Sequence, residues 1–157
     1  MNSSPETPHP SDTAQVEHVV VRGSATGFRQ EAAAGKYHFS VDEPAAVGGT
    51  EAAPDPYDYL LGALGACTSM TVGWYARKNT MPLESVQVSL SHSRIHARDC
   101  ADCETKTGML DRIDVDVKLI GDLTTEQRTK LMEIAGKCPV HKTLKSEIDI
   151  RLRAAQG

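Results

Sequence analysis

The sequence predicts an α+β fold that is organised around one long helix. Residues 56–78 repeat apolar and small side chains at spacings of three and four, which is typical of a helix. Three further segments (36–41, 83–97 and 109–120) alternate apolar and polar side chains, as half-buried strands do. The expected order of elements is β-β-β-α-β-β-α-β. Because neighbouring strands follow one another in the chain, this order favours antiparallel pairing.

The N-terminal third is expected to form a three-stranded meander. Residues 16–22 are rich in β-branched side chains, and a turn at 24–27 leads to a second strand at 28–33. The alternating segment 36–41 is the third strand. The stretch 42–56 then contains prolines and two adjacent glycines, so we expect a loop there.

The long helix is expected to begin at Pro56 and to end near Asn79. Proline is tolerated at the first helical position because no helical hydrogen bond needs its missing N–H. Three glycines, Gly62, Gly65 and Gly73, lie inside the helix, and each costs up to about 1 kcal/mol relative to alanine. Tertiary packing must therefore hold this helix, and the glycines predict that another element approaches it closely.

One stripe of this helix is expected to be apolar and buried. It is formed by residues at helical spacing: Leu60, Ala63, Leu64, Cys67, Met70, Thr71 and Trp74. Cys67 therefore lies on the apolar face. Taken alone, a cysteine in such a position is most often a small buried hydrophobic residue.

The second half of the chain is expected to add two strands, two helical segments and a last strand. The two alternating runs flank a turn that contains two cysteines. A helix capped by Thr124 or Thr125 follows and stops near Gly136. A short helical turn opens at Cys138, and residues 147–152 close the chain as a strand.

Composition narrows the class of protein. The chain has 157 residues and a net charge of −4, which argues against nucleic acid or an anionic membrane as the main partner. No stretch reaches the roughly 18 to 20 apolar residues that a membrane span needs. Residues 1–15 read as a solvated tail without signal-peptide features, and 16–157 as one domain. Four cysteines without an export signal favour thiol chemistry or metal binding in a cytoplasmic protein.

Cys138 changes the interpretation of Cys67. Pro139 follows it directly, so Cys138 is expected at a helix start, where the helix dipole stabilises a thiolate. His141 would lie on the same face of that turn. Cys67, in contrast, lies too far inside its helix for the dipole to act on it. A nearby cationic side chain, most naturally an arginine, must therefore activate Cys67.

Cys100 and Cys103 form a C-x2-C pair that is preceded by His92 and His96. The two histidines stand roughly 13 Å apart on an extended strand, too far to bind one ion together. Only His96, Cys100 and Cys103 can converge easily. Three interpretations remain: a zinc site, a redox dithiol pair, or two reduced cysteines in a loop.

These features resemble the OsmC/Ohr family of thiol-dependent peroxidases. The resemblance covers residues 16–153 and is strongest over 42–70 and 137–144. In that family the first cysteine sits in a long central helix and the second precedes a proline, as Cys67 and Cys138 do. The C-x2-C insertion looks like that of an uncharacterised subgroup of OsmC-like redox proteins.

The resemblance implies an intertwined homodimer in which antiparallel sheets wrap around paired central helices. It also implies a peroxiredoxin-type organic hydroperoxide reductase in oxidative-stress defence. Cys67 would be the nucleophile and Cys138 the resolving cysteine, with an external dithiol as reductant and no metal or other cofactor. An alkyl hydroperoxide would contact four apolar residues of the helix: Leu60, Leu64, Met70 and Trp74.

Departures from the family pattern set further expectations. The position of the family's active-site arginine falls on Glu31, so Arg29, two residues earlier on the same strand face, is the expected replacement. The alternative function is a zinc-binding or non-catalytic OsmC-like redox or interaction module. It would use the turn that contains His96, Cys100 and Cys103.

Overall fold

A computed structural model describes residues 19–154; the expected tail at 1–15 and the start of the first strand at 16–18 lie outside them. The chain divides into two compact units, the first ending at Pro56 and the second beginning at Tyr57. The single domain expected over 16–157 stays a prediction. Each unit has its own antiparallel sheet, and helices complete the second. The predicted α+β class is confirmed.

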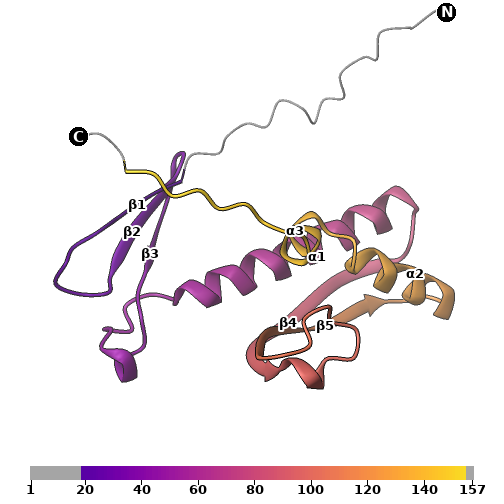
Figure 1. Ribbon diagram of the computed structural model, residues 1–157. Coiled ribbons are helices and arrows are strands. Elements are labelled where there is room, and N and C mark those ends of the chain that lie inside the picture. Colours follow the sequence, from indigo (N-terminus) through magenta and orange to yellow (C-terminus); the bar gives the residue numbers. More distant parts are fainter. Residues whose placement is uncertain (1–18, 155–157) are drawn as a thin grey trace, which may run out of the picture. The chain divides into compact units, whose positions relative to one another are not determined.

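The first unit contains the predicted meander. Strands β1 (Val19–Gly23), β2 (Gln30–Ala34) and β3 (Tyr37–Val41) pair antiparallel in chain order (Figure 1). Gly35 has a φ of 59°, which lets the chain reverse tightly between β2 and β3. The alternating segment therefore forms the strand that its pattern predicted.

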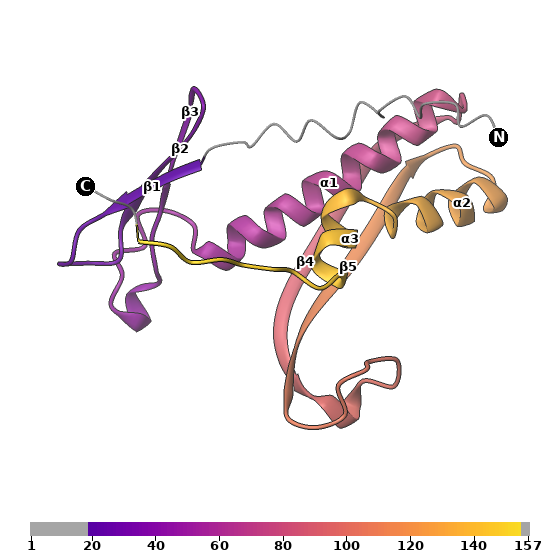
Figure 2. The ribbon, with the colours of Figure 1, turned by 45° about the horizontal axis from the view of Figure 1, so that its top comes forward.

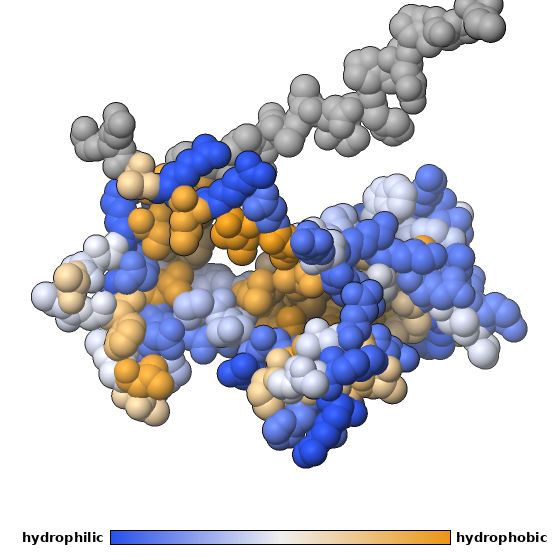
Figure 3. Space-filling model, viewed as in Figure 1, coloured by the Kyte–Doolittle hydropathy of each residue, from blue (hydrophilic) through white to orange (hydrophobic). Residues whose placement is uncertain are grey.

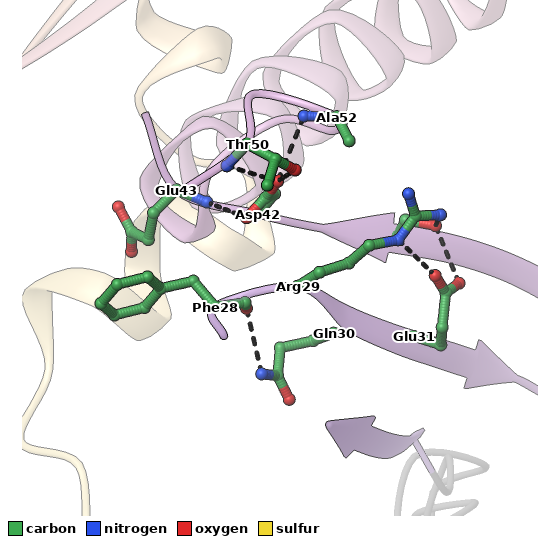
Figure 4. A network of polar contacts seen from close by, with 9 residues as sticks. Phe28, Arg29, Gln30, Glu31, Asp42, Glu43, Thr50 and Ala52 are labelled. Atoms are coloured by element: carbon green, nitrogen blue, oxygen red, sulfur yellow. Dashed lines mark hydrogen bonds and ion pairs between the residues drawn. The ribbon is translucent and has the colours of Figure 1, made fainter. Parts of the chain in front are cut away.

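The loop after β3 is held by one carboxylate. Asp42 is 1% exposed, and it accepts hydrogen bonds from the backbone N–H groups of Glu43, Thr50 and Ala52 at 2.9, 3.1 and 3.2 Å. The Thr50 hydroxyl also donates to it (Figure 4). These hydrogen bonds, that of the Thr50 hydroxyl first, lower the pKa of Asp42 to about 2. The loop, which includes a short 3-10 helix at Ala45–Val47, is thereby fixed.

The second unit is built on helix α1 (Pro56–Lys78) and the hairpin β4–β5. Strands β4 (Leu83–His96) and β5 (Met109–Gly121) pair along their whole length (Figures 1 and 2). The loop between them begins with a short 3-10 helix, Ala97–Asp99. Alternate residues of both strands are half-buried, as the sequence pattern predicted.

The buried face of α1 differs from the predicted stripe. Its buried residues are Leu64, Gly65, Thr68, Val72 and Ala76. Of the expected stripe, Leu64 is buried, whereas Leu60, Trp74 and Met70 are 37%, 54% and 71% exposed. Within the single chain these four side chains therefore do not share one buried stripe.

Helix α1 packs closely against β4 through a face that differs from the predicted stripe. A Cβ atom on Gly65 would lie 2.7 Å from a methyl carbon of Leu90, so a larger residue there would require the Leu90 side chain to move. The helix therefore turns its small residues toward the hairpin. The close approach that the glycines predicted occurs at Gly65, and the approaching element is β4 of the same chain.

Two shorter helices complete the second unit. Helix α2 (Thr125–Ala135) begins with a capping box between Thr124 and Gln127, and it ends at Gly136, as predicted. Its buried side chains join those of α1 in one core cluster: Val72, Ala76, Leu123, Leu131 and Ala135. Helix α3 (Pro139–Lys145) follows, with Cys138 as its N-cap.

The predicted last strand is absent. Residues 147–152 form no strand, and Ile148, Ile150 and Leu152 are 49%, 80% and 95% exposed. A strand needs the edge of a sheet, and within the described part of the second unit no strand pairs with this segment. Ile148, Ile150 and Leu152 alternate with polar residues, but no strand within the described part of the second unit pairs with them. None of the helices within residues 19–154 is long and apolar enough to cross a bilayer.

Candidate functional site

Cys67 lies in the middle of α1 with a free, half-buried thiol. It borders the buried face of the helix, since the next residue, Thr68, is 2% exposed. The Thr71 hydroxyl donates to the backbone carbonyl of Cys67 at 2.7 Å. Within the second unit, the sulfur is thus carried by a rigid element and remains partly accessible.

Cys138 is the other free cysteine, and it is fully buried. Its sulfur accepts a hydrogen bond from the backbone N–H of His141 at 3.3 Å, which makes it the N-cap of α3. The same sulfur lies 3.5 Å from the Thr68 hydroxyl oxygen. The fold therefore brings Cys138 against α1 at Thr68, the residue next to Cys67. We call this contact between Thr68 and Cys138 the Cys138 junction.

Two small pockets lie beside this junction. One, of about 220 Å³, has apolar walls and a polar rim: Leu64, Ile113, Val115 and Leu144, with Asp111, His141 and Lys145. The other, of about 190 Å³, is lined by Thr68, Val115, Val117, Met132, Ala135, Gly136 and His141. His141 and Val115 belong to both, so the surroundings of Cys138 offer apolar surface next to a few polar groups.

The four expected substrate contacts do not share one pocket. Leu64 lines the pocket next to His141. Met70 lines a separate pocket of about 430 Å³, which also includes Gly73. Leu60 and Trp74 are exposed on α1, and the Lys78 ammonium lies 5.0 Å from the Trp74 ring centroid. Of the four residues, only Leu64 therefore lines a pocket beside the Cys138 junction.

Arg29 belongs to the first unit, whereas Cys67 belongs to the second. Its guanidinium donates to Glu31 at 2.9 Å and to the Ser40 hydroxyl at 3.4 Å, and Ser40 donates to the same carboxylate at 2.8 Å (Figure 4). The hydrogen bond from Ser40 and the ion pair with Arg29 lower the pKa of Glu31. Arg29 thus pairs with the residue that occupies the expected position of the family arginine.

The C-x2-C pair forms a disulfide. Cys100 and Cys103 are bonded to each other in the loop between β4 and β5. His96 is exposed, and no group of three or more histidine, cysteine or acidic residues within the described residues is arranged to hold a metal ion. In this structure the two cysteines are therefore neither free thiols nor arranged as metal ligands.

Sequence reasoning missed the partner of His92. Its Nε2 lies 3.0 Å from an Asp111 carboxylate oxygen, and its ring stacks on that of Tyr57 with centroids 4.5 Å apart. The imidazole therefore joins the start of α1 to the hairpin. Strand β4 runs from Leu83 to His96, so His92 and His96 have the extended spacing that the sequence predicted. Pairing β4 with β5 in register, so that His92 faces Ile113, would have brought Asp111 within reach.

Comparison with known proteins identifies the fold family. A family model described as OsmC-like protein matches residues 48–153. An OsmC-like protein from Mycoplasma pneumoniae superposes with a TM-score of 0.66 at 16% identity, covering 84% of this chain and 89% of its own. An organic hydroperoxide resistance protein from Legionella pneumophila gives 0.60 at 20% identity, covering 84% and 90%.

A third structure, an organic hydroperoxide resistance protein of Bacillus subtilis, gives a TM-score of 0.56 at 20% identity, covering 84% of this chain and 92% of its own. No curated protein sequence matches the chain. At these identities the solved structures establish the fold, and the family model covers more than half of the sequence. The chain belongs to the OsmC-like protein family.

Proposed function

We propose that this protein reduces organic hydroperoxides through a cycle of Cys67 and Cys138, in defence against oxidative stress. The observation that carries the proposal is the position of the free Cys138 sulfur. It lies 3.5 Å from the hydroxyl of Thr68, the residue that follows Cys67 in α1. Two structural relatives are named organic hydroperoxide resistance proteins, which agrees with this role.

The cycle needs two protein sulfurs and one external reductant. The Cys67 thiolate attacks the O–O bond, so that an alcohol leaves and Cys67 becomes a sulfenic acid. The Cys138 thiol then attacks the Cys67 sulfur, which releases water and forms a disulfide. An external dithiol restores both thiols by exchange and leaves as its own disulfide. The cycle requires a reducing compartment, such as the cytoplasm.

The pockets beside Cys138 favour an apolar peroxide. Four aliphatic side chains, Leu64, Ile113, Val115 and Leu144, line the larger of the two. Burying an alkyl group against such a surface is favourable by roughly 25 cal/mol per Å². Hydrogen peroxide has no alkyl group to bury, so we expect it to be the poorer substrate. No metal or other cofactor enters this cycle.

A cation is still needed near Cys67, and Arg29 is our candidate. In the first unit its guanidinium pairs with the exposed Glu31 carboxylate, and such exposed pairs are weak. Arg29 can therefore exchange Glu31 for a thiolate or a peroxide oxygen at little energetic cost. Replacing Arg29 with alanine should slow the attack of Cys67, whereas the Cys138 step should keep its rate.

We propose a homodimer that covers the exposed side of α1. We define the α1 seam as Leu60, Ala63, Cys67, Met70 and Trp74, whose spacings of three and four match the pattern by which two helices pack together. Met70 and Trp74 are 71% and 54% exposed in the single chain. Figure 3 shows apolar side chains exposed on the second unit. A second copy of α1 would cover the seam and shelter Cys67.

Mass spectrometry of the peroxide-treated protein tests the cycle. The protein is first fully reduced and then treated with one equivalent of cumene hydroperoxide in the absence of reductant. We expect the loss of two hydrogen atoms, mapped to a Cys67–Cys138 disulfide by peptide analysis. A disulfide that forms at Cys100–Cys103 alone, with Cys67 unmodified, would contradict the proposal.

Two serine variants separate the roles of the sulfurs. Cys67→Ser should abolish peroxide consumption, because the nucleophile is lost. Cys138→Ser should still release one equivalent of alcohol and accumulate a sulfenic acid on Cys67, which dimedone traps. Thr107→Ala, an exposed change in the β4–β5 loop, is the control and should turn over normally. Equal dimedone labelling of the two cysteine variants would reject the assignment.

A further inference from the structure

The loop between β4 and β5 carries the only disulfide among the four cysteines, all of which lie in the described part of the chain. Cys67 and Cys138, which the proposed cycle uses, are free. The disulfide joins Cys100 to Cys103, so its ring is closed within one loop. It therefore belongs to neither the core nor the peroxide cycle, and its presence calls for another explanation.

A structural role explains it poorly. A disulfide stabilises a protein mainly by constraining the unfolded chain, and the effect is smallest for the shortest rings. The hairpin is already paired up to His96 and Met109, where the loop begins. The Ala97 N–H donates to the carbonyl of Gly108, and the Cys100 N–H donates to the carbonyl of Ala97, so backbone hydrogen bonds close the base of the loop. The disulfide can open without breaking the sheet.

The sulfurs are also accessible to a reaction partner. Cys100 and Cys103 are half-buried, and the two residues between them, Ala101 and Asp102, are exposed. The loop lies at the end of the hairpin that is opposite to α2, because β4 starts and β5 ends beside that helix (Figure 2). A thiol can therefore approach this disulfide from solvent without entering the core.

Lys106 is hydrogen-bonded to the backbone of one of the two cysteines. Its ammonium donates a hydrogen bond to the backbone carbonyl of Cys103, which holds a positive charge beside that residue. A nearby cation favours a thiolate, and a sulfur that leaves as a stabilised thiolate leaves faster. We therefore expect an incoming thiolate to attack Cys100 and Cys103 to be the sulfur that leaves.

From this arrangement we infer that Cys100–Cys103 is a second redox centre, which exchanges its disulfide with an external dithiol. One thiolate of the dithiol attacks Cys100, and the Cys103 thiolate leaves and takes up a proton. The second thiol of the dithiol then attacks the mixed disulfide, giving two protein thiols and an oxidised dithiol. Two electrons and two protons pass to the protein. This centre does not depend on the peroxide cycle.

A variant that keeps only this pair provides the test. In the full chain with Cys67→Ser and Cys138→Ser, the oxidised protein is mixed with an equimolar amount of reduced dithiothreitol, a reduced protein dithiol, or glutathione. We expect both dithiols to yield two protein thiols in the native state, whereas glutathione, which has a single thiol, should leave most of the pair oxidised because the freed Cys103 thiol expels it from Cys100. Faster reaction with the protein dithiol would identify a protein partner, and faster reaction with dithiothreitol a small dithiol.

Further variants test the roles within the pair. Cys103→Ser has no disulfide to open, so it is treated with oxidised glutathione: the Cys100 thiolate should displace one glutathione and keep the other in a stable mixed disulfide, because no Cys103 thiol remains to expel it. Lys106→Met should slow reduction roughly threefold to tenfold and shift its pH profile, and Lys106→Arg should restore both, because it keeps the charge. Lys118→Met, which removes an exposed lysine of β5 outside the loop, is the matched control.

Two outcomes would overturn the inference. If the disulfide is reduced only after the protein unfolds, or if its reduction lowers the unfolding midpoint as much as a core mutation does, the bond is structural. If the reduced pair takes up one equivalent of zinc tightly and no longer reacts with an oxidised dithiol, the loop is a metal site. Either result is independent of whether Cys67 consumes peroxide.

Discussion

Cys138 is the N-cap of α3, and its sulfur contacts Thr68 of α1. Cys100 and Cys103, in contrast, lie in the loop beyond the last paired residues of the β4–β5 hairpin. Folding alone brings Cys138 to the Thr68 hydroxyl, across 70 residues of chain. The other pair is three residues apart and is joined by its own covalent bond. The chemistry of Cys138 should therefore depend on the packing of the second unit, and that of Cys100–Cys103 should not.

The largest expected effect follows from disturbing this packing. Leu131 is fully buried in the core cluster that α2 forms with α1. Replacing it with alanine should lower the free energy of unfolding by about 2 to 5 kcal/mol, because the cavity is not refilled. Removing the disulfide with Cys100→Ser and Cys103→Ser should cost less than about 2 kcal/mol, the limit for so short a ring. Urea denaturation followed through Trp74 fluorescence measures both.

The same experiment can contradict the comparison. If the double serine variant loses as much stability as Leu131→Ala, the β4–β5 loop is part of the cooperative core. If Leu131→Ala costs nothing, the junction of α1 and α2 does not hold the second unit together. Either result would remove the contrast between the two cysteine regions.

The loop after β3 is held in a third way, by the buried carboxylate of Asp42. Since the pKa of Asp42 is lowered to about 2 from its ordinary 3.8, the folded state favours the ionised form. This contribution to stability is complete above about pH 4 and is lost as the pH falls toward 2. Asp42→Asn should remove it and increase amide hydrogen exchange at Thr50 and Ala52, which both donate to this side chain.

Thr50→Val separates the hydroxyl from the charge at this site. The Thr50 hydroxyl makes the largest contribution to the lowered pKa, so its loss should raise the pKa of Asp42 part of the way to its ordinary value. The acid transition would then move to higher pH, while the three backbone N–H groups still hold the carboxylate. An unchanged transition in both variants would show that another group controls acid stability.

The α1 seam offers a smaller and more specific test, which concerns assembly. Met70 is 71% exposed, and a lysine there should not disturb the single chain. In a homodimer, however, the two charges would lie in the helix contact, and we expect Met70→Lys to weaken association at least about tenfold, which corresponds to about 1.4 kcal/mol. Sedimentation velocity over a concentration series measures this. Met109→Lys, an exposed methionine at the start of β5, is the matched control. Equal dimerisation of both variants would exclude the seam.

Much of the fold was predictable because its signals are local. Proline at position 56 and the Thr124 capping box fix where two helices begin, and strict alternation identifies β4 and β5. Cys138 was recognised as a helix start because Pro139 follows it. Each of these features depends only on residues that are neighbours in the sequence.

What could not be predicted depends on contacts between distant elements. Helix α1 packs Gly65 close to Leu90, a contact that its own sequence does not reveal, and hydropathy alone placed Met70 in the buried face. The segment 147–152 has the pattern of a strand, but no strand of its unit pairs with it. Asp42 was assigned only to a loop, because its donors become visible once the chain folds back on it.

The smallest expected effect concerns the hydroxyl at the Cys138 junction. Thr68→Val keeps the shape of a side chain that is 2% exposed and removes only the oxygen 3.5 Å from the Cys138 sulfur. Stability should fall by about 1 kcal/mol, the typical net contribution of one hydrogen bond. Formation of the Cys67–Cys138 disulfide should slow several-fold, because a hydroxyl that can donate to the attacking sulfur is lost. Stopped-flow measurement after one equivalent of peroxide gives this rate separately from that of sulfenic acid formation.

Thr71→Val is the matched control for this prediction. Thr71 lies one turn further along α1, and its hydroxyl donates to the backbone carbonyl of Cys67, not to Cys138. Its loss should leave the disulfide step unchanged, because a threonine that bonds back to its own helix contributes little to the junction. If Thr71→Val slows this step and Thr68→Val does not, the hydroxyl that matters acts on Cys67. The junction with Cys138 would then support only packing, and the contrast between the two cysteine regions would rest on burial alone.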